Sequence, residues 1–359
     1  MSKLIVNGPV QLNGEVSVRG AKNASLPILL ASALSTQPVV LENIPTELKD
    51  IDVAIEALEY IGCHVKKGIG CVEIRSSEIE KTSLPAEIAS RFRSALLFLS
   101  ILLGKCGHAK ITMPGGCDLG DRKFDLHLEG LRQLGAKVEV INNCIQVWAD
   151  RLVSKDINFY LPTTTGTENI MIAACFAEGK TRIFNANTRP EIVDFGNFLN
   201  TLGARISVRN RVVEIEGVTN FGGGQYRIMP GWDEALTYII AAGMTKGEVC
   251  VKDFSLEHIQ SDVSLLETSG MGIFEWGRNV FATAKNKQLK SFSLLTGPYP
   301  GINSDMQPLF AALASQCHGE STITDQRFTE RFAYVGELGK LGMQISNYGN
   351  CAVVNGPSR

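Results

Sequence analysis

The chain has 359 residues, of which 44% are hydrophobic and 20% charged, and its formal net charge is −2. This is the composition of an ordinary globular protein long enough for two or more domains, and the near-neutral charge does not indicate a nucleic-acid or membrane surface. No apolar signal-peptide core opens the sequence, and the longest apolar run, residues 95–104, is too short to span a bilayer. The nine cysteines and five histidines show no metal-ligand spacing. We therefore expect a cytoplasmic protein with free thiols, no metal and no other cofactor.

The first 20 residues predict a β-hairpin. Residues 3–6 and 15–18 have the composition of strands, and Asn13-Gly14 lies between them. Asn-Gly is a favoured two-residue turn between antiparallel strands, so we expect the turn at this dipeptide.

One sequence pattern then recurs along the chain: an amphipathic helix that ends in a glycine, followed by a strand. The glycines are 73, 68, 67 and 72 residues apart and lie at positions 62, 135, 203, 270 and 342. A glycine after the last helical turn is typical of a left-handed C-cap. Another helix, which is apolar, and a strand precede each copy of this pattern. The sequence therefore predicts five modules of about 70 residues, each reading helix, strand, helix, strand, strand.

Two glycine-rich stretches interrupt this pattern. Residues 221–224, Phe-Gly-Gly-Gly, separate the third and fourth modules and predict a linker. Residues 113–122 predict a loop in which Cys117 lies five residues before Arg122. A nearby guanidinium can lower the pKa of a thiol and make it reactive, so Cys117 is a candidate acid or nucleophile. The alternative is a small residue in an ordinary turn.

Several short motifs, spread from residue 3 to about 354, resemble those of the UDP-N-acetylglucosamine enolpyruvyl transferases (UDP-N-acetylglucosamine 1-carboxyvinyltransferases). The motifs are Gly20–Ala24, Pro114–Cys117, Asp125–His127, Pro190–Asp194 and Ser304–Gln307. The resemblance implies an α/β fold, the two-domain inverse α/β barrel, built from six modules. It places the first domain at residues 22–225 and the second at residues 1–21 with 226–359. Only five modules are present, so the second domain is expected to be incomplete.

The resemblance also implies a reaction. The family moves the enolpyruvyl group of phosphoenolpyruvate to a sugar hydroxyl, which needs an acid, a base and cations for the phosphate. Cys117 matches the proton donor to C3 of phosphoenolpyruvate, and Asp305 matches the base at the accepting hydroxyl. By its position alone, Asp305 could equally cap the helix that follows it.

Further residues match the family's substrate contacts. Lys22, which also counts among the catalytic residues, and Asn23 open a helix and match an anion site, although a solvated first turn is the alternative. The arginines suit forked contacts with phosphate. The remaining matches implied by the resemblance are Arg93, Arg122, Asp125, Leu126, Thr164, Thr165, Gly166 and Arg331.

The sequence departs from the family at several substrate-facing places. Arg189 stands where the family has a glutamate, Pro162 where some members have a lysine, and Gly231-Trp232 where it has an Asp-Arg pair. Lys123-Phe124 replaces Pro-Val in the segment that contains Asp125. These changes leave three alternatives open: transfer to UDP-N-acetylglucosamine, transfer to another nucleotide in secondary metabolism, or a truncated paralogue that binds a nucleotide sugar without turnover.

The expected partners are phosphoenolpyruvate and a UDP-sugar or another nucleotide, with no nucleic acid and no membrane. A second domain with two modules would leave part of its apolar face uncovered. We therefore also expect that this domain self-associates or binds a partner through that face.

Overall fold

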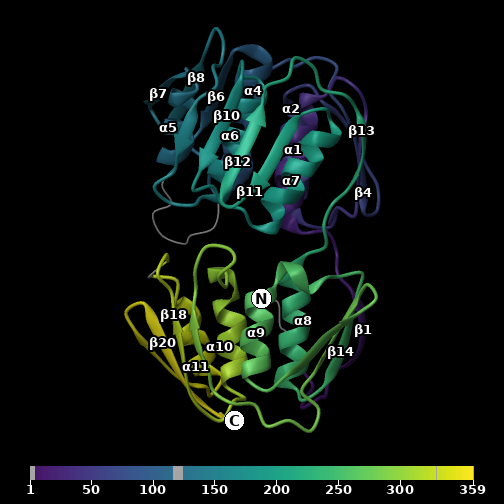
Figure 1. The fold of residues 1–359 in the computed structure, drawn as a ribbon, viewed down its shortest axis with the longest axis vertical. Helices are drawn as coiled ribbons and strands as arrows, with labels where there is room; N and C mark the ends of the chain where they lie inside the picture. The colour runs from purple at the N-terminus through teal and green to yellow at the C-terminus, as the bar shows by residue number, and fades with distance from the viewer. Residues whose placement is uncertain (1–4, 116–123, 329, 359) are drawn as a thin grey trace. The chain divides into compact units, whose positions relative to one another are not determined.

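The computed structural model describes residues 5–115, 124–328 and 330–358. The chain divides into two compact units. The central unit is Arg19–Met229, and the terminal unit combines Met1–Val18 with Pro230–Arg359 (Figure 1). None of the helices in the described residues has both the length and the apolar character that a bilayer crossing requires.

The predicted repeat is confirmed, because each of five modules reads helix, strand, helix, strand, strand. The central unit contains the first three: α1 (Lys22–Ala31), β2 (Val39–Glu42), α2 (Lys49–Tyr60), β3 (His64–Lys67), β4 (Cys71–Arg75); α4 (Leu97–Cys106), β6 (His108–Thr112), α5 (Asp125–Gln133), β7 (Lys137–Ile141), β8 (Cys144–Trp148); α6 (Thr164–Cys175), β10 (Lys180–Phe184), α7 (Pro190–Thr201), β11 (Arg205–Arg209), β12 (Val212–Glu216). The terminal unit contains the other two: α8 (Trp232–Met244), β14 (Glu248–Lys252), α9 (Gln260–Thr268), β15 (Gly272–Trp276), β16 (Asn279–Thr283); α10 (Gln307–Ala314), β18 (Gly319–Thr324), α11 (Ala333–Lys340), β19 (Gln344–Tyr348), β20 (Cys351–Gly356).

Each module forms a four-stranded sheet in the same order. The three strands of the module are antiparallel, and a fourth strand pairs in parallel with the first of them. In three sheets this fourth strand comes from the segment before the module: β5 (Ser83–Leu84), β9 (Asp156–Asn158) and β17 (Ser293–Leu295). In the first sheet of each unit, the fourth strand comes from a more distant segment. β13 (Gly224–Arg227) pairs with β2 in the central unit, and β1 (Asn13–Ser17) pairs with β14 in the terminal unit.

The predicted N-terminal hairpin is wrong. Asn13 and Gly14 lie inside β1, which pairs in parallel with β14, from Asn13 opposite Glu248 to Ser17 opposite Lys252. The described residues before β1 form no strand. A long-range partner therefore overrides the local turn preference of Asn-Gly, which sequence alone could not reveal.

The glycine-rich stretch 221–224 is not itself the linker. Gly224 begins β13, which pairs with β2 inside the central unit, and the units divide after Met229. A Cβ on Gly223 would lie 2.4 Å from the carbonyl oxygen of Pro38. The glycine is therefore needed for close approach of two backbones rather than for flexibility.

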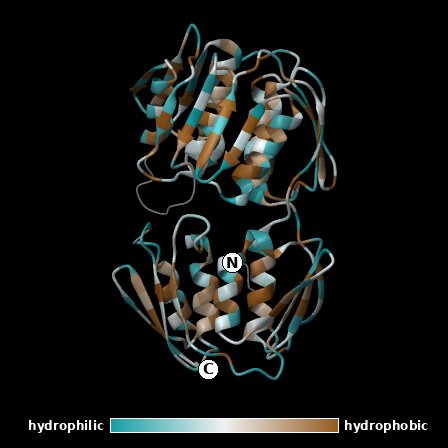
Figure 2. Ribbon diagram, in the orientation of Figure 1, coloured by the Kyte–Doolittle hydropathy of each residue, from teal (hydrophilic) through white to brown (hydrophobic). Residues whose placement is uncertain are grey.

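The first helix of each module contributes a continuous buried stretch to the core of the central unit. All of residues 24–31 in α1, 97–103 in α4 and 166–175 in α6 are buried. The second helices are amphipathic and bury one side. In the terminal unit, Figures 1 and 2 show α8, α9 and α10 between the strands at the two sides, with apolar stretches along these helices. Helices thus form the interior and sheets the exterior, which is the inverse arrangement that the resemblance implied.

The predicted helix-ending glycines are confirmed. Their φ angles are +107°, +95°, +101°, +108° and +93° in chain order. L-residues rarely adopt this conformation, so the recurring glycine has a geometric cause.

We predict that Gly203→Ala lowers the free energy of unfolding by about 1–2 kcal/mol, because alanine is strained at this φ. Steric overlap contributes little, since the nearest atom to an added Cβ is the carbonyl oxygen of Asn220 at 3.9 Å. The matched control is Gly336→Ala inside α11, where no atom lies within 4 Å; this change should stabilise by up to about 1 kcal/mol. Urea unfolding followed by circular dichroism measures both, and equal effects of the two substitutions would contradict the assignment.

Candidate active site

Most described candidate residues lie at the beginnings of helices, at equivalent places in the modules. Lys22 and Asn23 begin α1, Arg93 begins the 3-10 turn Arg93–Leu96 that leads into α4, and Thr164 begins α6. Asp305 lies in the turn Ser304–Met306 that leads into α10. The first turn of a helix has unpaired N–H groups and a positive dipole end, so these positions suit anionic ligands.

The Lys22 side chain is exposed and has a carboxylate neighbour. Its Nζ lies 2.9 Å from Oδ2 of Asp50, near the start of α2. An ion pair this exposed contributes little to stability and breaks readily, so the ammonium can exchange Asp50 for a ligand anion.

A buried histidine lies near two candidate residues, Arg93 and Asp125, whose charges act on it. His127, on α5, is 3% exposed. Burial, and then the positive charge of Arg93, lower the pKa of His127 to about 3, against the opposing effect of Asp125. The imidazole is therefore neutral at physiological pH and its Nδ1 has no hydrogen-bond partner among the described residues. It can serve as a neutral hydrogen-bonding group beside Arg93.

Asp125 and Leu126 line a cavity of about 590 Å³ between α5 and residues 157–160. The Tyr160 hydroxyl donates a hydrogen bond of 2.7 Å to Oδ2 of Asp125. This bond to a carboxylate raises the pKa of Tyr160. The cavity is lined by apolar side chains together with several polar ones, which is typical of small-molecule sites.

The first turn of α6 is held by Asn187. The Nδ2 of Asn187 donates to Oγ1 of Thr164 at 3.0 Å, and its backbone N–H donates to Oγ1 of Thr167 at 3.3 Å. The turn itself is capped, because the Gly166 N–H donates to Oγ1 of Thr163 at 3.3 Å. Thr164, Thr165 and Gly166 are thus fixed in place before any ligand binds.

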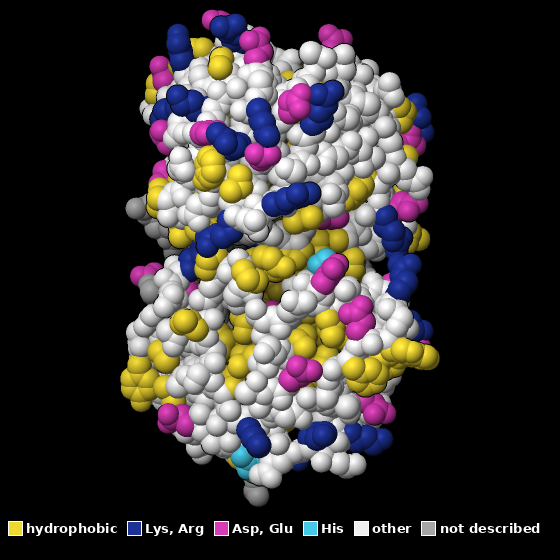
Figure 3. Space-filling model, viewed as in Figure 1, with side chains coloured by type: hydrophobic (Ala, Val, Ile, Leu, Met, Phe, Trp, Pro, Cys, Tyr) yellow, Lys and Arg dark blue, Asp and Glu magenta, His cyan; other side chains and the backbone are white. Residues whose placement is uncertain are grey.

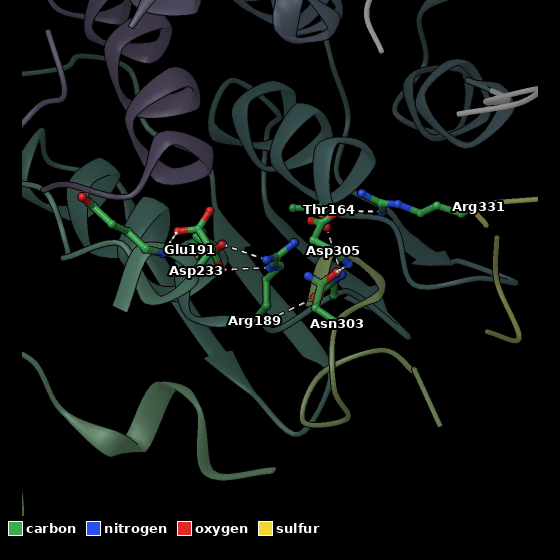
Figure 4. A network of polar contacts seen from close by, with 9 residues as sticks. Thr164, Arg189, Glu191, Asp233, Asn303, Asp305 and Arg331 are labelled. Carbon is green, nitrogen blue, oxygen red and sulfur yellow. Dashed lines mark hydrogen bonds and ion pairs between the residues drawn. The ribbon is translucent and has the colours of Figure 1, made fainter. Parts of the chain in front are cut away.

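A buried charged cluster lies next to this turn. Arg189 forms a two-pronged ion pair with Glu191, with both N–O distances 2.9 Å (Figure 4). Their side chains are 11% and 1% exposed. Glu168, on α6, is also buried, and burial together with the charge of Glu191 raises its pKa to about 8, although Arg189 acts in the opposite direction. Glu168 is therefore protonated at neutral pH.

In the terminal unit the structure brings together Asp305 and Arg331. The Oδ1 of Asp305 lies 2.6 Å from Nη1 of Arg331 (Figure 4). The side chain of Asn303, not that of Asp305, caps the turn, because Asn303 Oδ1 accepts the Asp305 N–H at 2.9 Å. The carboxylate of Asp305 is thus left for the ion pair, and the helix-cap alternative is wrong.

The segment before Arg331 is anchored by a buried aspartate. Burial by itself would raise the pKa of Asp325, but the backbone N–H groups of Phe328 and Arg327 donate to this carboxylate, at 2.8 and 2.7 Å, and its pKa is lowered overall. Gln307, the first residue of α10, also donates to Asp325. Asp325 therefore couples the Arg331 segment to the helix that follows Asp305.

Two predicted residues, Cys117 and Arg122, lie outside the described residues. Conversely, sequence reasoning missed Asn187, Glu168 and Asp325. Of these, only Asp325 carried a usable signal, since an aspartate two and three residues before the N–H groups it accepts is typical of an Asx turn.

We predict that Glu168→Gln changes the pH dependence of stability. The folded-state pKa of about 8 lies above the usual 4.5, so the stabilising contribution of the protonated carboxyl is complete below about pH 4.5 and is lost as pH rises through about 8. The free energy of unfolding of the variant should therefore rise relative to wild type between these pH values. Urea unfolding from pH 5 to 9, with the exposed Glu178→Gln as control, measures this, and parallel curves would contradict it.

The chain is similar to known proteins along almost its whole length. The family model for EPSP synthase (3-phosphoshikimate 1-carboxyvinyltransferase) matches residues 6–358. The UDP-N-acetylglucosamine 1-carboxyvinyltransferase of Hydrogenovibrio crunogenus is 38% identical over 358 residues, which are 99% of this chain and 85% of that protein. The same-named protein of Coxiella burnetii is 38% identical over 363 residues, which are 100% and 83%.

Solved structures show the same fold. The enolpyruvyl transferase NikO from Streptomyces tendae has a TM-score of 0.87 at 20% identity, over 98% of this chain and 83% of that one. EPSP synthase from Acinetobacter baumannii has a TM-score of 0.73 at 15% identity, over 99% and 84%. The match along the whole chain, together with the level of identity, shows that the protein belongs to the EPSP synthase family of carboxyvinyltransferases, also called enolpyruvyl transferases.

Proposed function

We propose that this protein transfers the enolpyruvyl group of phosphoenolpyruvate to a hydroxyl of UDP-N-acetylglucosamine, the first step of peptidoglycan synthesis. The observation that carries the proposal is the 38% identity, over almost the whole chain, to relatives named for this reaction. The Asp305–Arg331 ion pair supports it, because Asp305, the candidate base, has a cation beside its carboxylate. Phosphate release from phosphoenolpyruvate and UDP-N-acetylglucosamine tests it directly.

The reaction assigns a role to each candidate group. The sugar hydroxyl adds to C2 of phosphoenolpyruvate and gives its proton to Asp305, while Cys117 gives a proton to C3. The resulting tetrahedral ketal then loses phosphate and a C3 proton, which restores the carbon–carbon double bond. Arg331 orients the carboxylate of Asp305 through their 2.6 Å contact.

The remaining residues bind the substrates. Lys22, Arg93 and Arg122 are the cations for the phosphate and carboxylate of phosphoenolpyruvate. Asn23 and the capped turn Thr164–Gly166 contribute hydrogen-bond donors for anionic oxygens. Asp125 and Leu126, which line the 590 Å³ cavity, bind the nucleoside part.

A second candidate is transfer to the hydroxyl of another nucleotide. The observation that favours it is Arg189, which replaces a family glutamate and is buried against Glu191. Phosphate release with a panel of nucleotides distinguishes the two acceptors. Nucleotide-sugar binding without phosphate release from any acceptor would instead identify a paralogue without turnover.

We predict that Asp305→Ala lowers kcat by about 10²–10⁴-fold, the usual contribution of a positioned acid or base. Nucleotide affinity should remain nearly unchanged, because the carboxylate acts on the hydroxyl proton as the bond forms. Steady-state kinetics and calorimetric titration with the nucleotide separate the two quantities. The control is Glu248→Ala, which removes the carboxylate of an exposed ion pair elsewhere in the terminal unit. If the Asp305→Ala enzyme kept more than about a tenth of the wild-type kcat, Asp305 would not be the catalytic base.

We predict that Cys117 is the most reactive thiol of the nine. Burial raises the pKa of the Cys63, Cys175, Cys250 and Cys317 thiols, to about 12 for Cys175 and about 11 for Cys317, which suppresses their thiolate forms. A fosfomycin-type epoxide should therefore label Cys117 first, and faster with nucleotide bound. Peptide mapping by mass spectrometry reads the site, Cys117→Ser is the control, and preferential labelling of Cys63 or Cys250 in the native protein would refute the prediction.

A further inference from the structure

The residue that follows the first strand of each module occupies the same place in the repeat. These residues are Asn43, Met113, Asn185, Asp253 and Asp325. The first four are half-buried or exposed, whereas Asp325 is 0% exposed. Figure 3 shows charged side chains spread over the surface, and a charged group is almost never fully buried unless it has partners. Because four modules do without a buried carboxylate at this place, the repeat itself does not require one.

The backbone of Asp325 is fixed at both of its polar groups. Its N–H donates to the carbonyl oxygen of Asn350 at 2.9 Å, and Nδ2 of Asn350 donates to the Asp325 carbonyl oxygen at 3.2 Å. Asn350 lies in the turn between β19 and β20. The carboxylate therefore extends from a backbone position that the sheet holds in place.

The two oxygens of this carboxylate hold different segments. Oδ1 accepts the backbone N–H groups of Arg327 and Phe328, and Oδ2 accepts Nε2 of Gln307. On one side, the carbonyl oxygen of Phe328 accepts the N–H of Arg331 at 3.0 Å. On the other side, Gln307 begins α10 two residues after Asp305. One buried side chain thus connects the segments that contain the candidate base and its arginine.

An ionised carboxylate can serve both segments at once. Burial by itself would raise the pKa of Asp325, but the N–H groups of Phe328 and Arg327 lower it overall, so the group is ionised at neutral pH. An ionised carboxylate accepts hydrogen bonds at both oxygens. An asparagine at this position would instead direct its N–H2 group at one set of donors.

We propose that Asp325 is a positioning residue for the proposed reaction, because its carboxylate holds the segments of Asp305 and Arg331 so that their side chains meet. The 2.6 Å contact of these two side chains orients the candidate base (Figure 4). Asp325 is completely buried, so it does not touch the substrates and acts through Asp305. The inference rests on the proposed function, since Asp305 acts as a base only in that reaction.

A purely structural role predicts different behaviour. If Asp325 only stabilised the terminal unit, its replacement would lower the melting temperature, and any loss of turnover would be the same with and without Asp305. A positioning role predicts instead that the loss of turnover depends on the presence of Asp305, because two groups that act together are not additive.

The kinetic test measures phosphate release by the full chain with phosphoenolpyruvate and UDP-N-acetylglucosamine. Asp325→Asn should lower kcat at least about tenfold, because small displacements of a catalytic group are costly, and calorimetric titration should show a nucleotide affinity within about twofold of wild type. In an Asp305→Ala background, the same substitution should lower kcat by less than about twofold. The matched control is Asp262→Asn, at another buried aspartate of the terminal unit, which should leave kcat unchanged.

Hydrogen exchange tests the same role without turnover. The Asp305 N–H donates to Oδ1 of Asn303 at 2.9 Å, and the Arg331 N–H donates to the carbonyl oxygen of Phe328. Neither of these bonds is made to Asp325, so their exchange reports on the position of the two segments. Both N–H groups should exchange faster in Asp325→Asn than in wild type.

A second variant keeps the test open if Asp325→Asn does not fold. Gln307→Met removes the donor on the Asp305 side alone, so it should speed exchange at the Asp305 N–H and lower kcat only when Asp305 is present.

Three results would overturn the proposal: a kcat that Asp325→Asn or its substitute Gln307→Met leaves unchanged, an equal loss of kcat with and without Asp305, or faster exchange at only one of the two N–H groups in Asp325→Asn. If the wild-type chain released no phosphate, the proposed function would fail, and the exchange measurements would still decide whether Asp325 holds both segments.

Discussion

The fold depends on the burial of one almost wholly apolar helix in every module. In α4 the seven residues 97–103 are all buried, and α1 and α6 are buried to a similar extent. Such a helix has no polar face to turn to water, so it is stable only when other elements surround it. A single module cannot supply that cover, because its sheet covers one side only. Modules must therefore pack together, helices inside and sheets outside, and the number of modules decides whether a unit is closed.

The same constraint determines where chemistry can occur. Apart from a few buried polar side chains, such as Ser100 on α4 and Glu168 on α6, the charged and hydrogen-bonding groups of these helices collect where the helices begin. Lys22, Arg93 and Thr164 occupy such positions in the central unit, and Asp305 occupies one in the terminal unit. The N-terminal ends of helices also have free N–H groups and positive dipole ends, so the repeat places anion-binding positions at equivalent points of successive modules.

Sequence reasoning predicted the features for which one residue type is required by the backbone geometry. The five helix-ending glycines need positive φ, and their spacing revealed the modules. It failed where a residue far away in the sequence determines the local structure. β1 pairs with β14 across more than half the chain instead of forming a hairpin, and Gly223 packs closely against Pro38 instead of serving as a linker. At the candidate site, motifs predicted Asp305 and Arg331 by resemblance, and the structure joins them in an ion pair. Nothing in the sequence showed that Asn187 holds Thr164 or that Glu168 is buried.

The buried cluster shows how a departure from the family can be accommodated. Glu168 is protonated at neutral pH, and Arg189 pairs with Glu191, so these three residues together carry no net charge. A glutamate at position 189, as the resemblance places in the family, would put three carboxyl groups in one buried region. Arginine therefore both compensates Glu191 and makes this region less negative next to the turn at Thr164. Because removal of one partner of a buried ion pair leaves an uncompensated charge, substitution of Arg189 or Glu191 alone is expected to destabilise this region.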